Sequence, residues 1–272
     1  MPLIGPDDPP CFDRLAGPAD ARVLLVCDHA SARIPASLKG LGLSAADLRR
    51  HIAVDIGAAA LTRRLAAALR VPAILAGYSR LVLDVNRPPG HPTAIPQVSD
   101  GTTIPGNQGL SRTARQARHD ALFVPYHHAI AMELDRLSAA CEAPALISIH
   151  SFTPVFDGQV RPWQLGVLWD YDPRMAVPLM EALAADPALT VGDNLPYSAR
   201  NETGYTAATH AQPAGRPHVM IEVRQDLLSD PAGVAHWAHV LLGALRPILA
   251  DGTLYKRQMH RRTPAWQPDH MA

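Results

Sequence analysis

The stretch from residue 145 to residue 154, ALISIHSFTP, constrains the fold of this chain more than any other. Its apolar, partly β-branched start has the length of a buried strand, and His150 and Ser151 stand at the carboxyl end of that strand. In open α/β sheets, ligands bind just beyond the carboxyl ends of the strands. A histidine there can bind a metal ion or move a proton. The alternative is a histidine that only caps a strand.

The same pattern, an apolar run that ends in polar residues, recurs along the chain. Predicted strands at 22–27, 81–85 and 217–223 carry Asp28-His29, Asn86-Arg87 and Glu222-Val-Arg224 in the same way. Further strands are predicted at 72–76, 164–169 and 189–191. Helices are predicted from Ser44, at 126–140, 173–184 and 229–250, and along the segment whose Leu61, Leu65 and Leu69 share one face and which ends before Pro72. This alternation predicts an α/β fold with a mixed, mainly parallel sheet covered by helices on both faces.

We expect one catalytic α/β domain over residues 1–253, with an irregular lead-in at 1–20. The segment 254–272, with Lys256 and Arg257 among polar residues and prolines, is interpreted as a flexible basic tail. Residues 89–110 are rich in Pro, Gly and Thr, which predicts a long loop that is either a lid or a surface excursion.

Composition narrows the class of partner. The 272 residues contain 25 Lys+Arg and 25 Asp+Glu, so no global basic field exists to attract nucleic acid. No apolar stretch has the length of a membrane helix, and the N-terminus lacks the basic start and apolar core of a signal peptide. Three widely spaced cysteines form no disulfide framework. We therefore expect a cytoplasmic protein whose partner is a small molecule; the sequence does not give its oligomeric state.

The residues at the strand ends suit hydrolysis of an amide. Two histidines and a carboxylate form a common catalytic zinc set, a separate glutamate can act as general base, and an arginine can bind a substrate carboxylate through two parallel hydrogen bonds. A serine nucleophile at Ser151 or a cysteine nucleophile at Cys27 are alternatives, but no GxSxG elbow surrounds Ser151.

Six segments carry a resemblance to a known family. They are VCDHASARIP (26–35), VDIGA (54–58), SRLVLDVNRPP (79–89), SIHSFTP (148–154), RNETGYT (200–206) and IEVRQDLL (221–228). Together they resemble the N-formylglutamate amidohydrolase family over about residues 20–250. The resemblance implies hydrolysis of N-formylglutamate to glutamate and formate, late in histidine degradation, with Zn²⁺ or another divalent metal. It also implies a fold similar to zinc carboxypeptidases and aspartoacylase-like amidohydrolases.

The resemblance also implies roles for single residues. His29 and His150 match the metal-binding histidines, Asn86 and Arg87 the pair that binds the substrate carboxylate, and Glu222 the general base. One departure concerns the HxxE pattern of the relatives, because Ala32 stands three residues after His29. The third ligand must come from elsewhere.

Asp55 is the first choice for that third ligand and Asp28 the second. A helix N-cap is the alternative role for Asp55. Either the metal site is rearranged or the metal is bound weakly.

Other polar residues are candidates for contacts with the substrate, each with a structural alternative. They are Arg80, Ser151, Arg200, Tyr205 and Arg224. Arg80 and Arg224 could instead form structural ion pairs, and Asp84 could orient Arg87. One of His127 and His128 could also line the site. The function expected first is hydrolysis of N-formyl-L-glutamate. The alternatives are a peptidase or deacylase acting on another acylated amino acid or cell-wall fragment, and a non-catalytic binding module.

Overall fold

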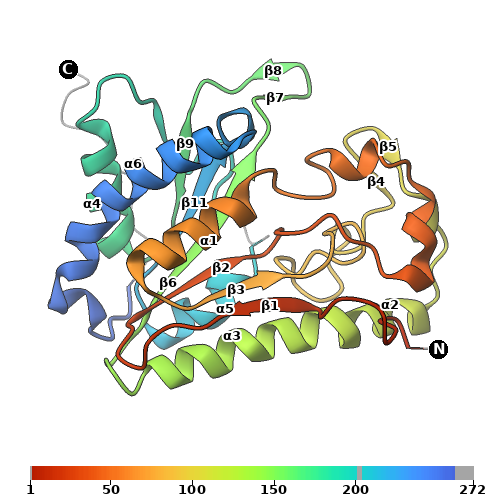
Figure 1. Cartoon of the computed structure of the whole chain (residues 1–272), viewed down its shortest axis with the longest axis horizontal. Helices are drawn as coiled ribbons and strands as arrows, with labels where there is room; N and C mark the ends of the chain where they lie inside the picture. Colours follow the sequence, from red (N-terminus) through yellow and green to blue (C-terminus); the bar gives the residue numbers. More distant parts are fainter. Residues whose placement is uncertain (1, 201–203, 261–272) are drawn as a thin grey trace.

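The computed structural model describes residues 2–200 and 204–260. Its centre is a seven-stranded sheet in the order β1-β3-β2-β6-β11-β9-β10 (Figure 1). The strands are β1 (Phe12–Leu15), β2 (Val23–Cys27), β3 (Ala73–Ala76), β6 (Ala145–Phe152), β9 (Leu165–Leu168), β10 (Val191–Asp193) and β11 (His218–Arg224). Pairs β3–β2, β2–β6, β6–β11 and β9–β10 are parallel, whereas β1–β3 and β11–β9 are antiparallel. The predicted mixed, mainly parallel sheet is confirmed.

Helices cover both faces of this sheet. The helices are α1 (Ala58–Leu69), α2 (Arg112–Arg118), α3 (Val124–Leu137), α4 (Pro173–Ala184), α5 (Thr206–His210) and α6 (Pro231–Ala250). One core cluster packs α1, α4 and α6 against one face, and a second packs α3 and the long irregular segments against the other (Figure 1). Strands β2 and β6 are buried along their whole length, which explains their continuous apolar sequence. Among the described residues, no helix has the length and apolar character needed to span a membrane.

The predicted strand at 81–85 is wrong. The segment is buried, but its backbone forms turns: Asp84 N–H donates to the carbonyl of Ala94 (2.8 Å), and the side chains of Asn107 and Arg118 donate to the carbonyls of Leu81 (2.8 Å) and Val82 (3.0 Å). Buried polar backbone groups need partners, and here loops and side chains supply them in place of a neighbouring strand. An apolar run of strand length therefore packs as irregular structure.

Two other predictions are revised. The helix expected from Ser44 is only a 3-10 turn at Asp47–Arg49. The segment expected as a tail from residue 254 begins with a 3-10 turn, Gly252–Tyr255, in which Leu254 and Tyr255 are buried. Arg174 donates to the carbonyls of Leu254 (3.0 Å) and Lys256 (2.5 Å) and holds this turn on the body. The rest of that segment, residues 261–272, lies outside the described residues.

The segment 89–110 is mostly irregular, as expected, but it contains the short hairpin of β4 (Val98–Ser99) and β5 (Thr102–Thr103). A second hairpin, β7 (Val155–Phe156) with β8 (Gln159–Val160), follows β6. Both hairpins lie at the edge of the molecule towards which β2 and β6 run (Figure 1).

Candidate active site

Three buried side chains from distant parts of the chain meet beside the central strands. His29 follows β2, His150 lies within β6, and Asp55 precedes α1. His150 Nδ1 lies 2.8 Å from Asp55 Oδ2, and His29 Nδ1 lies 3.3 Å from the same oxygen. One ligand atom from each residue lies within 4.8 Å of the other two. The structure therefore brings together the three residues that the sequence predicted as metal ligands.

Asp55 is held there by the local backbone rather than by a role in helix α1. Its N–H donates to the carbonyl of His29 (3.0 Å), and the N-cap of α1 is Gly57, with no side-chain cap. A Cβ at Gly57 would lie 2.3 Å from the Cβ of Leu228, and the φ of Gly57 is +79°, so glycine is required. The alternative reading of Asp55 as a helix N-cap is wrong.

An aspartate holds the outer nitrogen of each histidine. His29 Nε2 lies 2.7 Å from Asp84 Oδ1, and His150 Nε2 lies 3.1 Å from Asp28 Oδ2. Ionised carboxylates only accept hydrogen bonds, so both Nε2 atoms carry a proton, and in the neutral form of each ring the Nδ1 atom that faces Asp55 is the free ligand atom. Carboxylates that fix histidine ligands in this way are usual around metal ions. Asp28 thus contacts the Nε2 atom of His150. Asp55 is the carboxylate that lies between the Nδ1 atoms of the two rings.

Asp28 is itself fixed by further donors. Its Oδ1 accepts from the hydroxyls of Tyr126 (2.8 Å) and Thr206 (2.9 Å), and its Oδ2 accepts from the hydroxyl of Ser148 (3.2 Å). Burial raises the pKa of this carboxyl, but hydrogen bonding and the charge of His150 outweigh burial, so the pKa is lowered to about 2. Asp28 therefore stays ionised next to His150.

The same carboxylates act on the histidines. Burial lowers the pKa of both rings. For His150, hydrogen bonds to Asp28 and Asp55 overcome burial and leave the pKa well above its usual value. For His29, the opposing charges of Asp84 and Asp55 leave the pKa raised despite the nearby Arg80. The cluster therefore favours positive charge between its carboxylates, which a proton or a metal ion can supply.

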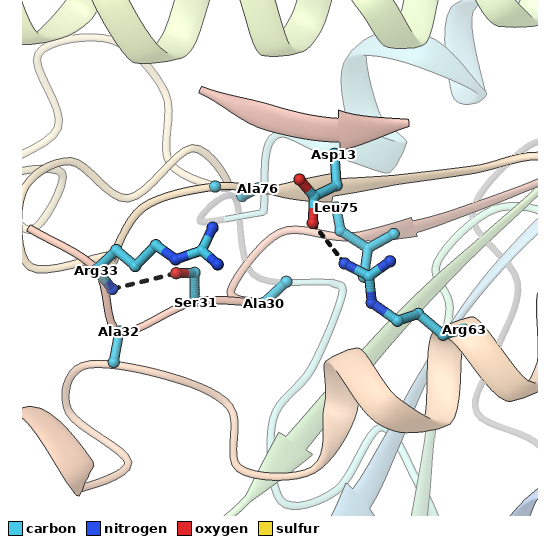
Figure 2. Close-up of a pocket in the computed structure, with 9 residues that line it drawn as sticks. Asp13, Ala30, Ser31, Ala32, Arg33, Arg63, Leu75 and Ala76 are labelled. Carbon is cyan, nitrogen blue, oxygen red and sulfur yellow. Dashed lines mark hydrogen bonds and ion pairs between the residues drawn. The ribbon is translucent and has the colours of Figure 1, made fainter. Parts of the chain in front are cut away.

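Ala32, at the position of the missing glutamate, belongs to a different cavity. That cavity, of about 460 Å³, is lined by Ala32, Arg33, Arg63 and Asp13 among others, and by none of the three ligand candidates (Figure 2). Arg63 forms an ion pair with Asp13 across it. The loop after His29 lies against this cavity, whereas Asp55 is the carboxylate whose oxygen lies beside both His29 and His150.

Glu222 lies beside the histidine cluster. On β11 it is in register with His150 on β6, so the two side chains share one face of the sheet. Glu222 is 5 % exposed, and its Oε2 has no hydrogen-bond partner among the described residues. Burial and the charge of Asp55 raise its pKa to about 7, against the opposing effect of His150, His29 and Arg80. A carboxyl with this pKa can take up and release a proton near neutral pH.

The arginines predicted to bind substrate have different surroundings. Arg80 pairs with Asp84 (2.7 Å) and approaches Asp55 (3.5 Å), and Arg224 pairs with Asp226 (2.8 Å). Arg80 and Arg224 thus form the ion pairs of the structural alternative, and their contact with a substrate stays a prediction. Arg87 is half-buried beside Asp84, and its charge helps to lower the pKa of that carboxyl, which burial alone would raise.

Asn86 anchors the backbone that leads into α5. Its Oδ1 accepts from the N–H groups of Tyr205 (2.8 Å) and Thr206 (3.0 Å). Tyr205 packs against Phe123 and His127. Arg200 lies 5.2 Å from the centre of the Trp169 ring. The intervening residues 201–203 of the predicted motif lie outside the described residues.

The nucleophile alternatives find no support in the geometry. The Ser151 hydroxyl donates to the carbonyl of Ile56 (2.8 Å). Burial raises the pKa of the Cys27 thiol well above its usual value, so the thiolate is disfavoured. His127 is buried against His210, 2.9 Å away, and His128 is exposed, so neither joins the cluster.

Sequence reasoning missed Tyr126, Ser148 and Thr206 as the groups that hold Asp28. Ser148 could have been found from the strand pattern, because it lies two residues before His150 and so shares its face. Tyr126 and Thr206 lie far away in the sequence and carry no such signal.

Comparisons with known proteins show which family and which solved structures the chain resembles. Residues 21–229 match the model of the family described as FGase: N-formylglutamate amidohydrolase. An N-formylglutamate deformylase of Pseudomonas aeruginosa is 28 % identical over 195 residues, which cover 65 % of this chain and 72 % of that protein. The crystal structure of gene product Atu2144 from Agrobacterium tumefaciens has a TM-score of 0.86 and 36 % identity, covering 91 % of this chain and 98 % of that one. An N-formylglutamate amidohydrolase from Ralstonia eutropha shares the fold, with a TM-score of 0.62, 18 % identity, and coverage of 87 % and 96 %.

Proposed function

Because the chain belongs to the N-formylglutamate amidohydrolase family, whose members hydrolyse amide bonds, we propose that it hydrolyses N-formyl-L-glutamate to glutamate and formate with the help of a divalent metal ion. The observation that carries the metal dependence is the group of His29, His150 and Asp55, whose ligand atoms lie within 4.8 Å of one another. Two imidazoles and a carboxylate suit Zn²⁺, and three protein ligands leave a coordination position open for water or substrate.

The chain's own groups fit this metal ion. Both Nδ1 atoms face Asp55, while Asp84 and Asp28 fix the opposite ring nitrogens. When bound, such an ion polarises a carbonyl and lowers the pKa of a water molecule. The net negative charge of the surrounding carboxylates favours a cation at this position.

Glu222 supplies the proton transfer. As a carboxylate it takes a proton from the attacking water, and as a neutral acid it passes that proton to the leaving amide nitrogen. Its pKa of about 7 allows both states near neutral pH. Burial and the position beside His150 support this role, because they hold the Glu222 carboxyl next to the histidines and away from bulk water.

The test pairs metal analysis with formate release. We expect about one zinc ion per chain, loss of formate release on chelation, and recovery when zinc is restored. His150→Ala and Asp55→Asn should lose both metal and activity, whereas Glu222→Gln should keep the metal and lose activity. His128→Ala, at an exposed histidine outside the cluster, is the matched control. Full activity in a metal-free preparation would contradict the metal dependence, and faster turnover of another N-acyl amino acid would contradict the substrate.

A further inference from the structure

Arg161, which follows the β7–β8 hairpin, is a buried arginine that the proposed chemistry does not use. It is 9 % exposed. Its guanidinium carbon lies 4.8 Å from the centres of the Phe156 and Tyr197 rings and 6.0 Å from that of Phe152. Its Nη1 donates to the hydroxyl of Tyr197 (3.1 Å) and the carbonyl of Thr153 (3.4 Å). We call Arg161 with these three aromatic rings the Arg161 cage.

No carboxylate of the described residues lies within ion-pair distance, 4.0 Å, of Arg161. Nor do its Nε and Nη2 donate a hydrogen bond to any described residue. Aromatic rings offset part of the cost of burying the charge, but a buried charge is normally paired. The two nitrogens form one edge of the guanidinium fork, which matches a carboxylate through two parallel hydrogen bonds. The cage therefore has the chemistry of a binding site for a carboxylate that comes from outside the chain.

The cage lies next to the catalytic cluster on the same face of the sheet. Phe152 follows His150 by two residues on β6, which places it about 6.6 Å further along the strand on the same side. Tyr197 connects the two regions electrostatically: burial raises the pKa of its phenol, the charge of Glu222 raises it further, and Arg161 and Arg80 oppose this. The phenol of Tyr197 therefore lies close enough to both Arg161 and Glu222 for their charges to act on it.

The span of the substrate is comparable with the spacing of His150 and Phe152 along β6. In N-formylglutamate the formyl carbon and the carbon of the side-chain carboxylate are joined by five covalent bonds, which span about 6 Å when extended. The α-carboxylate lies only three bonds from the formyl carbon. With the formyl group at the catalytic cluster, the side-chain carboxylate can extend further from the cluster than the α-carboxylate, which favours it as the group that Arg161 binds.

We propose that Arg161, held in its aromatic cage, binds the side-chain carboxylate of the substrate and so selects acidic N-acyl amino acids. This assignment rests on the proposed function and adds a specificity-determining residue to it. The sequence did not single out Arg161, because it stands in a hairpin exit with no motif around it.

The test compares Arg161→Gln with the unaltered protein on three substrates. N-formylglutamate and N-formylisoglutamine both carry the side-chain carboxylate, and N-formylglutamine replaces it with a neutral amide. We expect kcat/KM to fall about 10- to 100-fold on the first two, mainly through KM, because a charge-assisted hydrogen-bonded pair is lost. On N-formylglutamine we expect a change of less than about threefold. Arg161→Lys should give an intermediate loss on the acidic substrates, since it keeps the charge without the fork.

Arg63→Gln, which removes an exposed arginine of a surface ion pair, is the matched control and should leave all three values unchanged. Equal losses on all three substrates, with Arg161→Gln or with the better-tolerated Arg161→Lys, would overturn the assignment in favour of a structural role. A loss confined to N-formylglutamate and N-formylglutamine would assign Arg161 to the α-carboxylate and would also overturn it. Absence of turnover by the unaltered protein on N-formylglutamate would instead refute the proposed function.

Discussion

Replacing Glu222 by glutamine should remove activity and at the same time change how stability depends on pH. The carboxyl is 5 % exposed, and its pKa is raised from 4.5 to about 7. Between these two pH values the folded metal-free chain keeps the proton that the unfolded chain releases. The free energy of unfolding must therefore fall as pH rises through this window. By about pH 8 the loss is complete, because the carboxylate is then ionised in both states.

The magnitude follows from the same pKa. A tenfold change in proton affinity is worth about 1.4 kcal/mol, so the rise from 4.5 to about 7 corresponds to about 3 kcal/mol. Glutamine has the same shape and does not titrate. Relative to Glu222→Gln, the unaltered protein should therefore lose about 3 kcal/mol of stability between about pH 4.5 and about pH 8.

Urea unfolding in the presence of a chelator measures this difference, with the two proteins compared at each pH so that the titration of groups distant from Glu222 cancels. Glu181→Gln, at an exposed glutamate of α4, is the matched control and should show no such trend. A difference between Glu222→Gln and the unaltered protein that stays flat with pH, or that grows in the opposite direction, would refute the reasoning that burial strains this carboxyl.

Two further predictions concern the metal. Asp84→Asn should weaken zinc binding about 10- to 100-fold without removing a ligand, because the amide fixes His29 less well than the carboxylate. Calorimetric titration measures the zinc affinity, and an unchanged affinity would contradict the role of Asp84. Zinc binding should also weaken as pH falls from about 8 to about 6, because protons compete with zinc for His29 and His150, whose pKa values are raised in the metal-free chain. A zinc affinity that does not depend on pH would contradict this competition.

Strands and the polar residues at their ends were predictable from the sequence, because parallel strands bring their carboxyl ends to one edge. His29, His150 and Glu222 lie on the three neighbouring strands β2, β6 and β11 or at their ends, so one rule places all three. The role of Asp55 could not be predicted from the sequence. Whether this residue caps α1 or faces the histidines depends on the backbone at Gly57 and on the packing of Gly57 against Leu228. The segment 81–85 shows that apolar residues of strand length predict burial more safely than pairing in the sheet.

Arg161 and Tyr197 could not be predicted from the sequence for a different reason. They lie in connecting segments, where no periodicity marks which way a side chain points. Their relation to His150 depends on the end of β6 and on contacts between residues 36 positions apart. Loop residues that act on a substrate are therefore the part of such a site that sequence patterns describe least.

The donors around Asp28 also bear on how the molecule assembles. Asp28 accepts hydrogen bonds from Tyr126 on α3, Ser148 on β6 and Thr206 on α5, residues 98, 120 and 178 positions away in the chain. Contacts of such large sequence separation form slowly, because the intervening chain must be closed into loops first. A buried carboxylate without these donors is costly, so we expect the site to appear only at a late stage of folding. The chain would then gain the ability to bind metal only when the whole fold is complete, and not when the sheet alone has formed.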